Sequence, residues 1–251
     1  MTLPDIAIFF GISFLAAAIN SVAGGGTFLT FPVFILSGLT ALQANIMSTI
    51  ALWPGTVASA WGYRRVLQTD RKTLHPLLAI GLVGGAAGAG LLLATSEITF
   101  KALVPWLMLL ATLVFTFGRR LISVLNRCHL NLERGLPAFA TMALIAVYGG
   151  YFGAGIGILT LAMLQMMGHA HIHRMNAMKT ILTGAVNAIT VLIFIFSGKV
   201  IWPMAAVMIA GAVAGGYMGA RCALKISPEK VRLLVSVIGF SMTMYFFLKY
   251  P

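Results

Sequence analysis

Charge is what this sequence lacks most. Of its 251 residues only 9% are charged, just 5 are Asp or Glu, and 60% are hydrophobic. A soluble globular domain carries about 25% charged residues, so this composition could not cover the surface of a soluble fold. The soluble enzyme, the disulfide scaffold, the coiled coil and the disordered chain are therefore excluded. An integral membrane protein remains.

Cysteine is also scarce, and the basic balance has no nucleic-acid pattern. Cys128 and Cys222 are far apart and form no motif. The formal net charge is +12, but no basic run is interleaved with stacking aromatics. In membrane proteins Lys and Arg more often mark cytoplasmic loops. We therefore expect a lipid bilayer around the chain, with no metal, no cofactor and no nucleic-acid partner.

Long apolar runs take the place of charge. Windows of about 19 residues predict membrane segments at 5–37, 44–63, 74–94, 100–118, 136–168, 175–197, 201–221 and 232–249. Most have the length that crosses roughly 30 Å of hydrocarbon, but 5–37 and 136–168 are too long for one straight helix. Glycine runs interrupt both of these long segments, and glycine breaks helices.

The chain repeats itself. Under a shift of 131 residues, 45–50 falls on 176–181 and 84–89 falls on 215–220, with four of six identities each time. Several matching blocks in one register indicate two copies of one unit. The two long segments then occupy the same place in their halves.

Charge indicates how the halves are oriented. If 5–37 and 136–168 each enter and leave on one side, the basic loop residues gather on the cytoplasmic side, as the positive-inside rule requires. Each half then has an odd number of full crossings, so the second half is inverted. We predict an all-α polytopic membrane protein of two inverted-topology repeats, each with three transmembrane helices plus a glycine-broken helical hairpin. The first repeat is 1–118, a basic cytoplasmic linker is 119–135, and the second repeat is 136–251.

The hairpin tips are the predicted substrate site. A broken helix exposes orphan N–H groups at the start of its second half, where the helix dipole favours an anion. The second halves are expected to begin at Thr27 and near Gly157. The two tips could meet near the membrane midplane and hold one small anion. The tip residues are Gly24, Gly25, Gly26, Thr27, Gly153, Gly155 and Gly157.

Polar residues at the start of the following spans complete this site. Asn45 and Thr49 are spaced i, i+4, as are Asn176 and Thr180, so each pair presents one polar helix face with neutral donors. Lys179 is the one charged side chain clearly inside a predicted span, where charge is expensive and usually functional. The predicted spans contain no carboxylate, which a cation carrier would normally need. These features favour an anionic substrate.

Other interpretations stay open. Asn, Thr and Gly could simply mediate helix packing, and Lys179 could extend to the cytoplasmic interface. An anion channel could use the same hairpins. His169 and His173 could share a helix face and bind a metal or gate transport by protonation, but no ligand nearby completes a metal site. An intramembrane enzyme is disfavoured, because no nucleophile has a partner histidine at its depth.

Four motifs resemble the TauE/SafE family of membrane transporters. They are the stretch 23–32, with Gly24-Gly25-Gly26-Thr27, the closing 62–65, the stretch 151–157, and Asn176-Ala177-Met178-Lys179. The resemblance covers nearly the whole chain. It implies a non-enzymatic carrier that exports sulfite or organosulfonates such as sulfoacetate.

Residues and resemblance together predict a multi-pass transporter of the inner (plasma) membrane. It would move a small sulfur-containing anion by alternating access, with an anion channel or a carrier of another small organic anion as the alternative. Proton coupling, homo-oligomer formation, the direction of transport and the exact substrate stay open.

Overall fold

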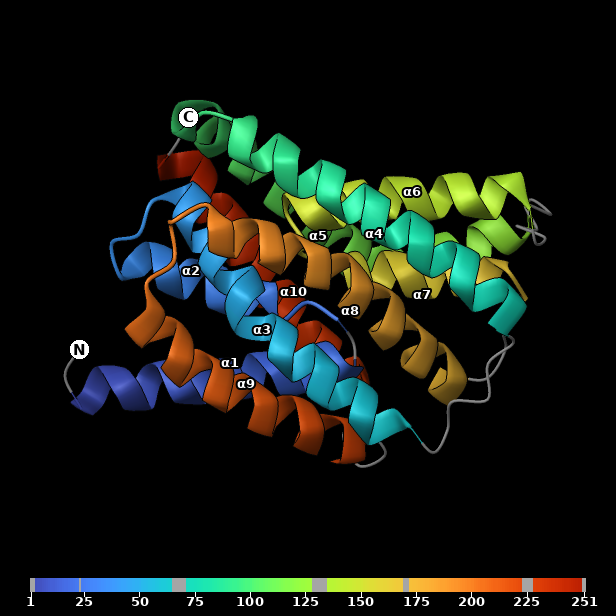
Figure 1. Ribbon diagram of the computed structural model, residues 1–251, viewed down its shortest axis with the longest axis horizontal. Coiled ribbons are helices and arrows are strands. Elements are labelled where there is room, and N and C mark those ends of the chain that lie inside the picture. The colour runs from blue at the N-terminus through green and yellow to red at the C-terminus, as the bar shows by residue number, and fades with distance from the viewer. Residues whose placement is uncertain are drawn as a thin grey trace.

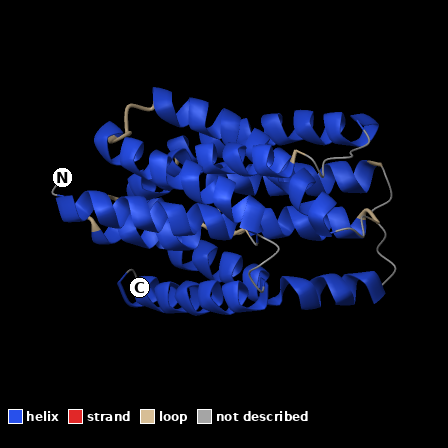
Figure 2. Cartoon of the chain, turned by 90° about the horizontal axis from the view of Figure 1, so that it is seen from below, coloured by secondary structure: helices blue, strands red, loops and turns tan. Residues whose placement is uncertain are grey.

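The computed structural model describes residues 3–22, 24–64, 71–127, 135–168, 172–222 and 228–249. Every regular element in these ranges is a helix (Figures 1 and 2). In chain order they are α1 (Leu3–Val22), α2 (Thr27–Leu36), α3 (Ala41–Tyr63), α4 (Arg71–Ala94), α5 (Glu97–Arg127), α6 (Leu136–Tyr151), α7 (Ile156–Met166), α8 (Ile172–Phe196), α9 (Trp202–Cys222) and α10 (Pro228–Lys249). The all-α prediction is confirmed.

Glycine divides each of the two long segments into two helices. Residues 5–37 form α1 and α2, and residues 136–168 form α6 and α7. Gly24 has a φ of 74° and Gly155 a φ of 78°, which is the left-handed region where a Cβ is unfavourable. The helix therefore ends before each break and starts again after it. Helix α2 begins at Thr27, as expected, and α7 begins at Ile156, directly before Gly157.

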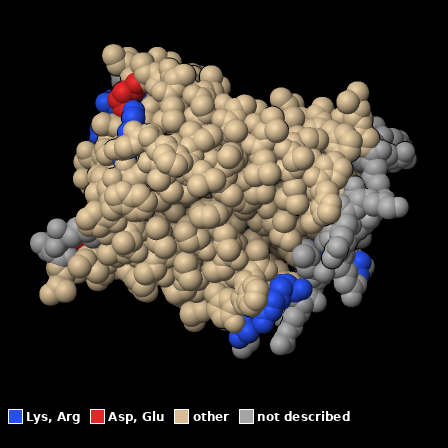
Figure 3. Space-filling view, in the orientation of Figure 1, with Lys and Arg blue, Asp and Glu red and all other residues tan. Residues whose placement is uncertain are grey.

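Among the described residues, five helices are long and apolar enough to cross a membrane, judged by length and composition. They are Leu3–Val22, Thr73–Ala94, Glu97–Gly118, Arg174–Phe196 and Trp202–Arg221. Their outer faces expose large apolar side chains such as Leu91 and Trp106, which suits contact with lipid. In Figure 3 the coloured charges lie towards the ends of the molecule, and the middle of the visible face is uncharged. The protein is a multi-pass membrane protein.

Helix α3 covers the expected span 44–63 but is not among these five helices. It is less apolar than they are because other helices surround it. Asn45, Ser48, Thr56 and Ser59 are all buried, so its polar residues face protein rather than lipid. The helix also continues through Pro54 without ending. Its central position brings α3 into contact with α8 and α9.

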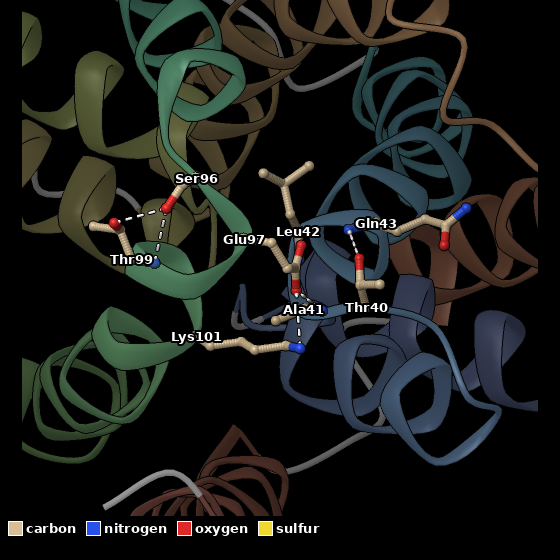
Figure 4. Close-up of polar contacts among 8 residues, drawn as sticks. All are labelled: Thr40, Ala41, Leu42, Gln43, Ser96, Glu97, Thr99 and Lys101. Atoms are coloured by element: carbon tan, nitrogen blue, oxygen red, sulfur yellow. Dashed lines mark hydrogen bonds and ion pairs between the residues drawn. The ribbon is translucent and has the colours of Figure 1, made fainter.

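Glu97, at the start of α5, fixes the start of α3 (Figure 4). Its carboxylate accepts hydrogen bonds from the backbone N–H of Ala41 at 2.8 Å and of Leu42 at 3.3 Å. The Thr40 hydroxyl accepts from the N–H of Gln43 at 3.3 Å. These acceptors satisfy orphan donors at the positive end of α3. The start of α5 is thereby tied to the start of α3.

The helix contacts follow the repeat. Each contact described below recurs when every helix is replaced by its counterpart in the other half, α1 by α6, α3 by α8 and α4 by α9. Helix α1 packs on α9, and α6 packs on α4; likewise α3 contacts α9, and α8 contacts α4. The short helices α2 and α7 lie towards opposite ends of the molecule in Figure 1. This pattern supports the repeat, while the inverted orientation in a membrane stays a prediction.

Small residues allow the helix pairs of this pattern to approach closely. A Cβ at Gly219 would lie 2.6 Å from Cα of Ala18 on α1, and a Cβ at Gly84 would lie 2.6 Å from Cβ of Ala146 on α6. Close backbone approach through small residues is how membrane helices pack without a hydrophobic driving force.

Parts of two expected features lie outside the described residues. Helix α5 runs on to Arg127, so it covers the first part of the expected linker 119–135, whose residues 128–134 are outside the described ranges. His169 and the side chain of His173 also lie outside them.

Candidate functional site

The two glycine breaks touch each other. A Cβ added to Gly24 would lie 3.1 Å from Cα of Gly157, and a Cβ added to Gly157 would lie 3.1 Å from Cα of Gly24. Any side chain at either position would push the two backbones apart. The two breaks are therefore in backbone contact with each other.

A small polar cavity lies at this junction. Its volume is about 30 Å³, enough for about two water molecules. The end of α1, the starts of α2 and α7, and the facing sides of α3 and α8 all contribute to its lining. Both breaks and both of the helices that follow them therefore converge on one site.

Half of the predicted site residues line this cavity. These are Thr27, Thr49, Gly153, Gly157, Lys179 and Thr180. The other six lie outside its lining: Gly24, Gly25, Gly26, Asn45, Gly155 and Asn176. All six belong to the breaks or to the first two turns of α3 and α8. The roles of all twelve in substrate binding stay predictions.

The first break is held by Asn20, a residue that sequence reasoning missed. Its Oδ1 accepts from the N–H of Gly25 at 3.1 Å, and its backbone oxygen accepts from the N–H of Gly24 at 3.1 Å. Its Nδ2 donates to the Thr56 hydroxyl at 3.4 Å. The Gly25 amide, predicted as a donor to substrate, is thus occupied by a side chain of the preceding helix.

At the second break, the cavity-lining Gly157 has a backbone N–H without a partner among the described residues. The N–H of Ile156 donates to the oxygen of Gly153 at 3.3 Å, and that of Ile158 donates to Gly155 at 3.0 Å. Within the described part of the chain, the N–H of Gly157 donates to no other residue. Because Gly157 lines the cavity in the first turn of α7, its amide is placed to bind an acceptor.

Lys179 connects the two halves. Its side chain is only 2% exposed, and its ammonium donates to the backbone oxygens of Asn20 and Ser21, both at 3.2 Å. These carbonyls belong to the last turn of α1, the negative end of the helix dipole, where a cation is favourable. Lys179 therefore points across to α1 and does not extend to the membrane interface. An ammonium has three N–H groups, so one remains for a ligand.

Asn45 makes the matching contact in the other half. Its Nδ2 donates to the backbone oxygen of Tyr151 at 2.9 Å, at the end of α6. Under the repeat, Tyr151 corresponds to the end of α1. The counterpart of Asn45 is Asn176, and the Oδ1 atoms of both are buried without a partner among the described residues. The end of each broken helix is thus capped by the other half, once by an amide and once by Lys179.

The cavity hydroxyls present lone pairs rather than hydrogens. The hydroxyl of Thr49 donates to Asn45 O at 3.0 Å, and that of Thr180 to Asn176 O at 2.7 Å. The Thr183 hydroxyl donates to Lys179 O at 2.8 Å. Back-bonding of this kind to the i−4 carbonyl is common in helices. To donate to an anion, as the sequence predicted for Thr49 and Thr180, each hydroxyl must first rotate away.

Other cavity residues carried a weaker sequence signal. Those that sequence reasoning missed are Asn20, Ser21, Thr56, Ser59, Thr183 and Asn187. Two of them, Thr183 and Asn187, follow Lys179 at successive intervals of four residues, a period that could have revealed them. The lining contains Lys179 and no Asp, Glu or His. Among the described residues, no group of three or more His, Cys, Asp or Glu could hold a metal.

Comparison with known proteins identifies a family of membrane transporters. The family described as sulfite exporter TauE/SafE matches residues 9–246. A "Probable membrane transporter protein" of Haemophilus influenzae is 25% identical over 239 residues, covering 95% of this chain and 92% of its own length. The "Probable membrane transporter protein YfcA" of Escherichia coli strain K12 is 26% identical over 243 residues, covering 95% and 88% respectively. No solved structure matches the chain.

Proposed function

Because this chain belongs to the sulfite exporter TauE/SafE family of membrane transporters, we propose that it exports a small sulfur-containing anion, sulfite or an organosulfonate. We place it in the inner (plasma) membrane. The family description and the names of the relatives support transport. The choice of an anion rests on the residues of the cavity.

One observation supports the anion most strongly. A lysine ammonium lies where the two glycine breaks meet, and the cavity around it has no carboxylate. A cation would be repelled by Lys179 and would find no carboxylate to compensate. A small anion would gain the charge of Lys179 together with the N–H of Gly157, and charge-assisted hydrogen bonds are the stronger kind.

Alternating access is the mechanism that suits a small cavity at a contact between halves. In two inverted repeats, a substrate site lies at the repeat interface and opens to one side of the membrane at a time. The cavity volume of about 30 Å³ is too small for an anion with several heavy atoms. Binding therefore requires α2 and α3 to separate from α7 and α8. The contact between Gly24 and Gly157 would break and form again in each cycle.

The residues divide into direct and supporting roles. Lys179 and Gly157 would contact the anion through N–H groups, and Thr27, Thr49, Thr180 and Gly153 would line its path. Asn20 would hold the first break in shape through Gly25. Lys179 would cap α1 with two of its N–H groups and bind the anion with the third, which links the bound anion to the end of α1.

Flux into proteoliposomes of the purified protein tests this function. Sulfite and sulfoacetate would be compared with acetate and sodium at clamped voltage, with and without a pH gradient. Saturable flux selective for the sulfur anions supports the carrier, and its response to the pH gradient reveals proton coupling. Unsaturable flux that does not distinguish between anions would indicate a channel instead. Absence of flux for both sulfur anions would contradict the proposed substrate.

A further inference from the structure

The two halves differ along the cavity. Helix α8 presents Lys179, Thr183 and Asn187 at i+4 spacing, and all three line the cavity. The corresponding positions of α3, found by subtracting the repeat shift of 131, are Ser48, Leu52 and Thr56. Of these, Ser48 is hydrogen-bonded to Thr30. The charge and the amide are therefore both on α8, at the two ends of one polar row.

Asn187 is the unpaired member of this row. Its Oδ1 is buried and has no hydrogen-bond partner within the described residues. A buried amide left unpaired is destabilising. Rotation of the amide exchanges its nitrogen and oxygen, so Asn187 can donate to a ligand or accept from one. A polar group kept unpaired against a substrate cavity is the group we expect a ligand to satisfy.

The separation of Lys179 and Asn187 limits the ligand. Eight residues of α-helix place their Cα atoms about 12 Å apart along the helix axis. The Lys179 ammonium is held near the end of α1 by Asn20 and Ser21. Asn187 lies beyond Thr183, two turns from Lys179. Because both side chains line one cavity, an anion bound at the ammonium could contact Asn187 through a polar group at its opposite end.

We propose that Asn187 is a specificity-determining residue that hydrogen-bonds the polar far end of an anion whose charge lies at Lys179. The ligand class is a short acyclic anion that bears a hydroxyl or carbonyl group opposite its charged group. This inference rests on the proposed function and narrows it. The difference between α3 and α8 makes the site directional, because a ligand bound the other way round would place its charge beside an amide.

Paired sulfonates test the inference. Transport of 2-hydroxyethanesulfonate and of ethanesulfonate is measured in the same proteoliposome preparation, with sulfite as a third anion. The wild type is expected to prefer the hydroxylated compound in kcat/KM by roughly three- to tenfold, the value of one hydrogen bond. Asn187→Leu should bring this ratio close to one. A ratio measured within one preparation does not depend on how much protein is folded.

Thr190→Val is the matched control. Thr190 is buried on the same helix, does not line the cavity, and donates to Val186 O at 2.9 Å. The Thr190→Val variant should keep the wild-type ratio. If Asn187→Leu prevents folding, Asn187→Thr introduces the residue type of the corresponding Thr56 and should give an intermediate ratio.

The outcomes separate the inference from the function it rests on. Equal transport of the two sulfonates by the wild type, or an unchanged ratio in Asn187→Leu, overturns the role of Asn187 and leaves the proposed function standing. Failure of the wild type to transport either sulfonate or sulfite overturns the proposed function and the inference with it.

Discussion

Lys179 in α8 donates a hydrogen bond to the backbone oxygen of Ser21 in α1 at 3.2 Å. The two residues are 158 positions apart in the chain and belong to different halves of the repeat. The buried ammonium therefore holds the end of α1, close to the contact between the two glycine breaks. This contact links the charged side chain of the cavity to the broken helices that would move during transport.

Replacement of Lys179 tests its role as the partner of the anion. Lys179→Gln removes the charge and should raise the KM for sulfite by roughly 10- to 100-fold, since a hydrogen bond to a charged group contributes about 1.5–3 kcal/mol. The measurement is the concentration dependence of flux in proteoliposomes. Lys199 is exposed and lies in a loop, so Lys199→Gln is the control and should leave the KM unchanged. An equal KM in wild type and Lys179→Gln would refute the role.

The contact between the glycine breaks predicts sensitivity to a single methyl group. Gly157 lies in helix α7 without a positive φ, so alanine introduces no backbone strain there. Its Cβ would still lie 3.1 Å from Cα of Gly24 and 3.4 Å from Cδ of Lys179. Gly157→Ala should therefore reduce the maximal flux at least tenfold while protein expression and membrane insertion persist.

Gly90→Ala provides the comparison for that variant. A Cβ at Gly90, also in a helix, would have nothing within 4 Å, and alanine there should stabilise the protein by up to about 1 kcal/mol. Flux at the wild-type level in both variants would show that the contact of the breaks is dispensable for transport.

Glu97 predicts a stability effect far from the cavity. Glu97→Ala removes the acceptor for the N–H groups of Ala41 and Leu42 and should destabilise the protein by about 0.5–2 kcal/mol, as loss of a helix cap does. Thermal unfolding in detergent measures this change. Lys101→Ala breaks only a partly exposed ion pair with Glu97 at 3.8 Å and should change stability by less than about 1 kcal/mol. Equal effects in the two variants would argue against capping.

Asn45 and Asn176 occupy corresponding positions but should respond differently to substitution. Asn45→Leu leaves the oxygen of Tyr151 without its donor and should cost about 1–3 kcal/mol of stability. The Oδ1 atoms of both asparagines are unpaired among the described residues, but Asn176→Leu breaks no bond like that of Asn45 to Tyr151, so stability should be unchanged or higher. If Asn176 binds substrate, flux falls nonetheless. Comparable destabilisation in both variants would contradict the asymmetry of the two caps.

Sequence patterns predicted the helices well because their signals are local. Apolar runs and glycine breaks marked the ends of α1, α2, α6 and α7 to within a few residues. The repeat then placed the two breaks at corresponding positions. The segment 44–63 was harder to interpret, since the polar residues of α3 are buried against other helices rather than exposed to lipid.

The site was only half predictable, because side-chain partners depend on helix packing. The sequence indicated that Lys179 lies inside a span, but not that α1 supplies its acceptors. Asn20 was overlooked because its role depends on Gly25, across the break. The hydroxyls of Thr49 and Thr180 were expected to face an anion as donors, and their hydrogens instead point to carbonyls one turn earlier. Such choices are decided by local geometry that a residue pattern does not contain.

The central claim is that a sulfur anion binds where Lys179 meets the two glycine breaks. Thermal unfolding of purified wild type and Lys179→Gln, titrated with sulfite at constant ionic strength, tests it most directly, because a ligand that binds the folded state raises Tm with its concentration. The account predicts a rising Tm for the wild type and a flat response for Lys179→Gln. A rise of equal size in both proteins, or none in the wild type, would contradict it.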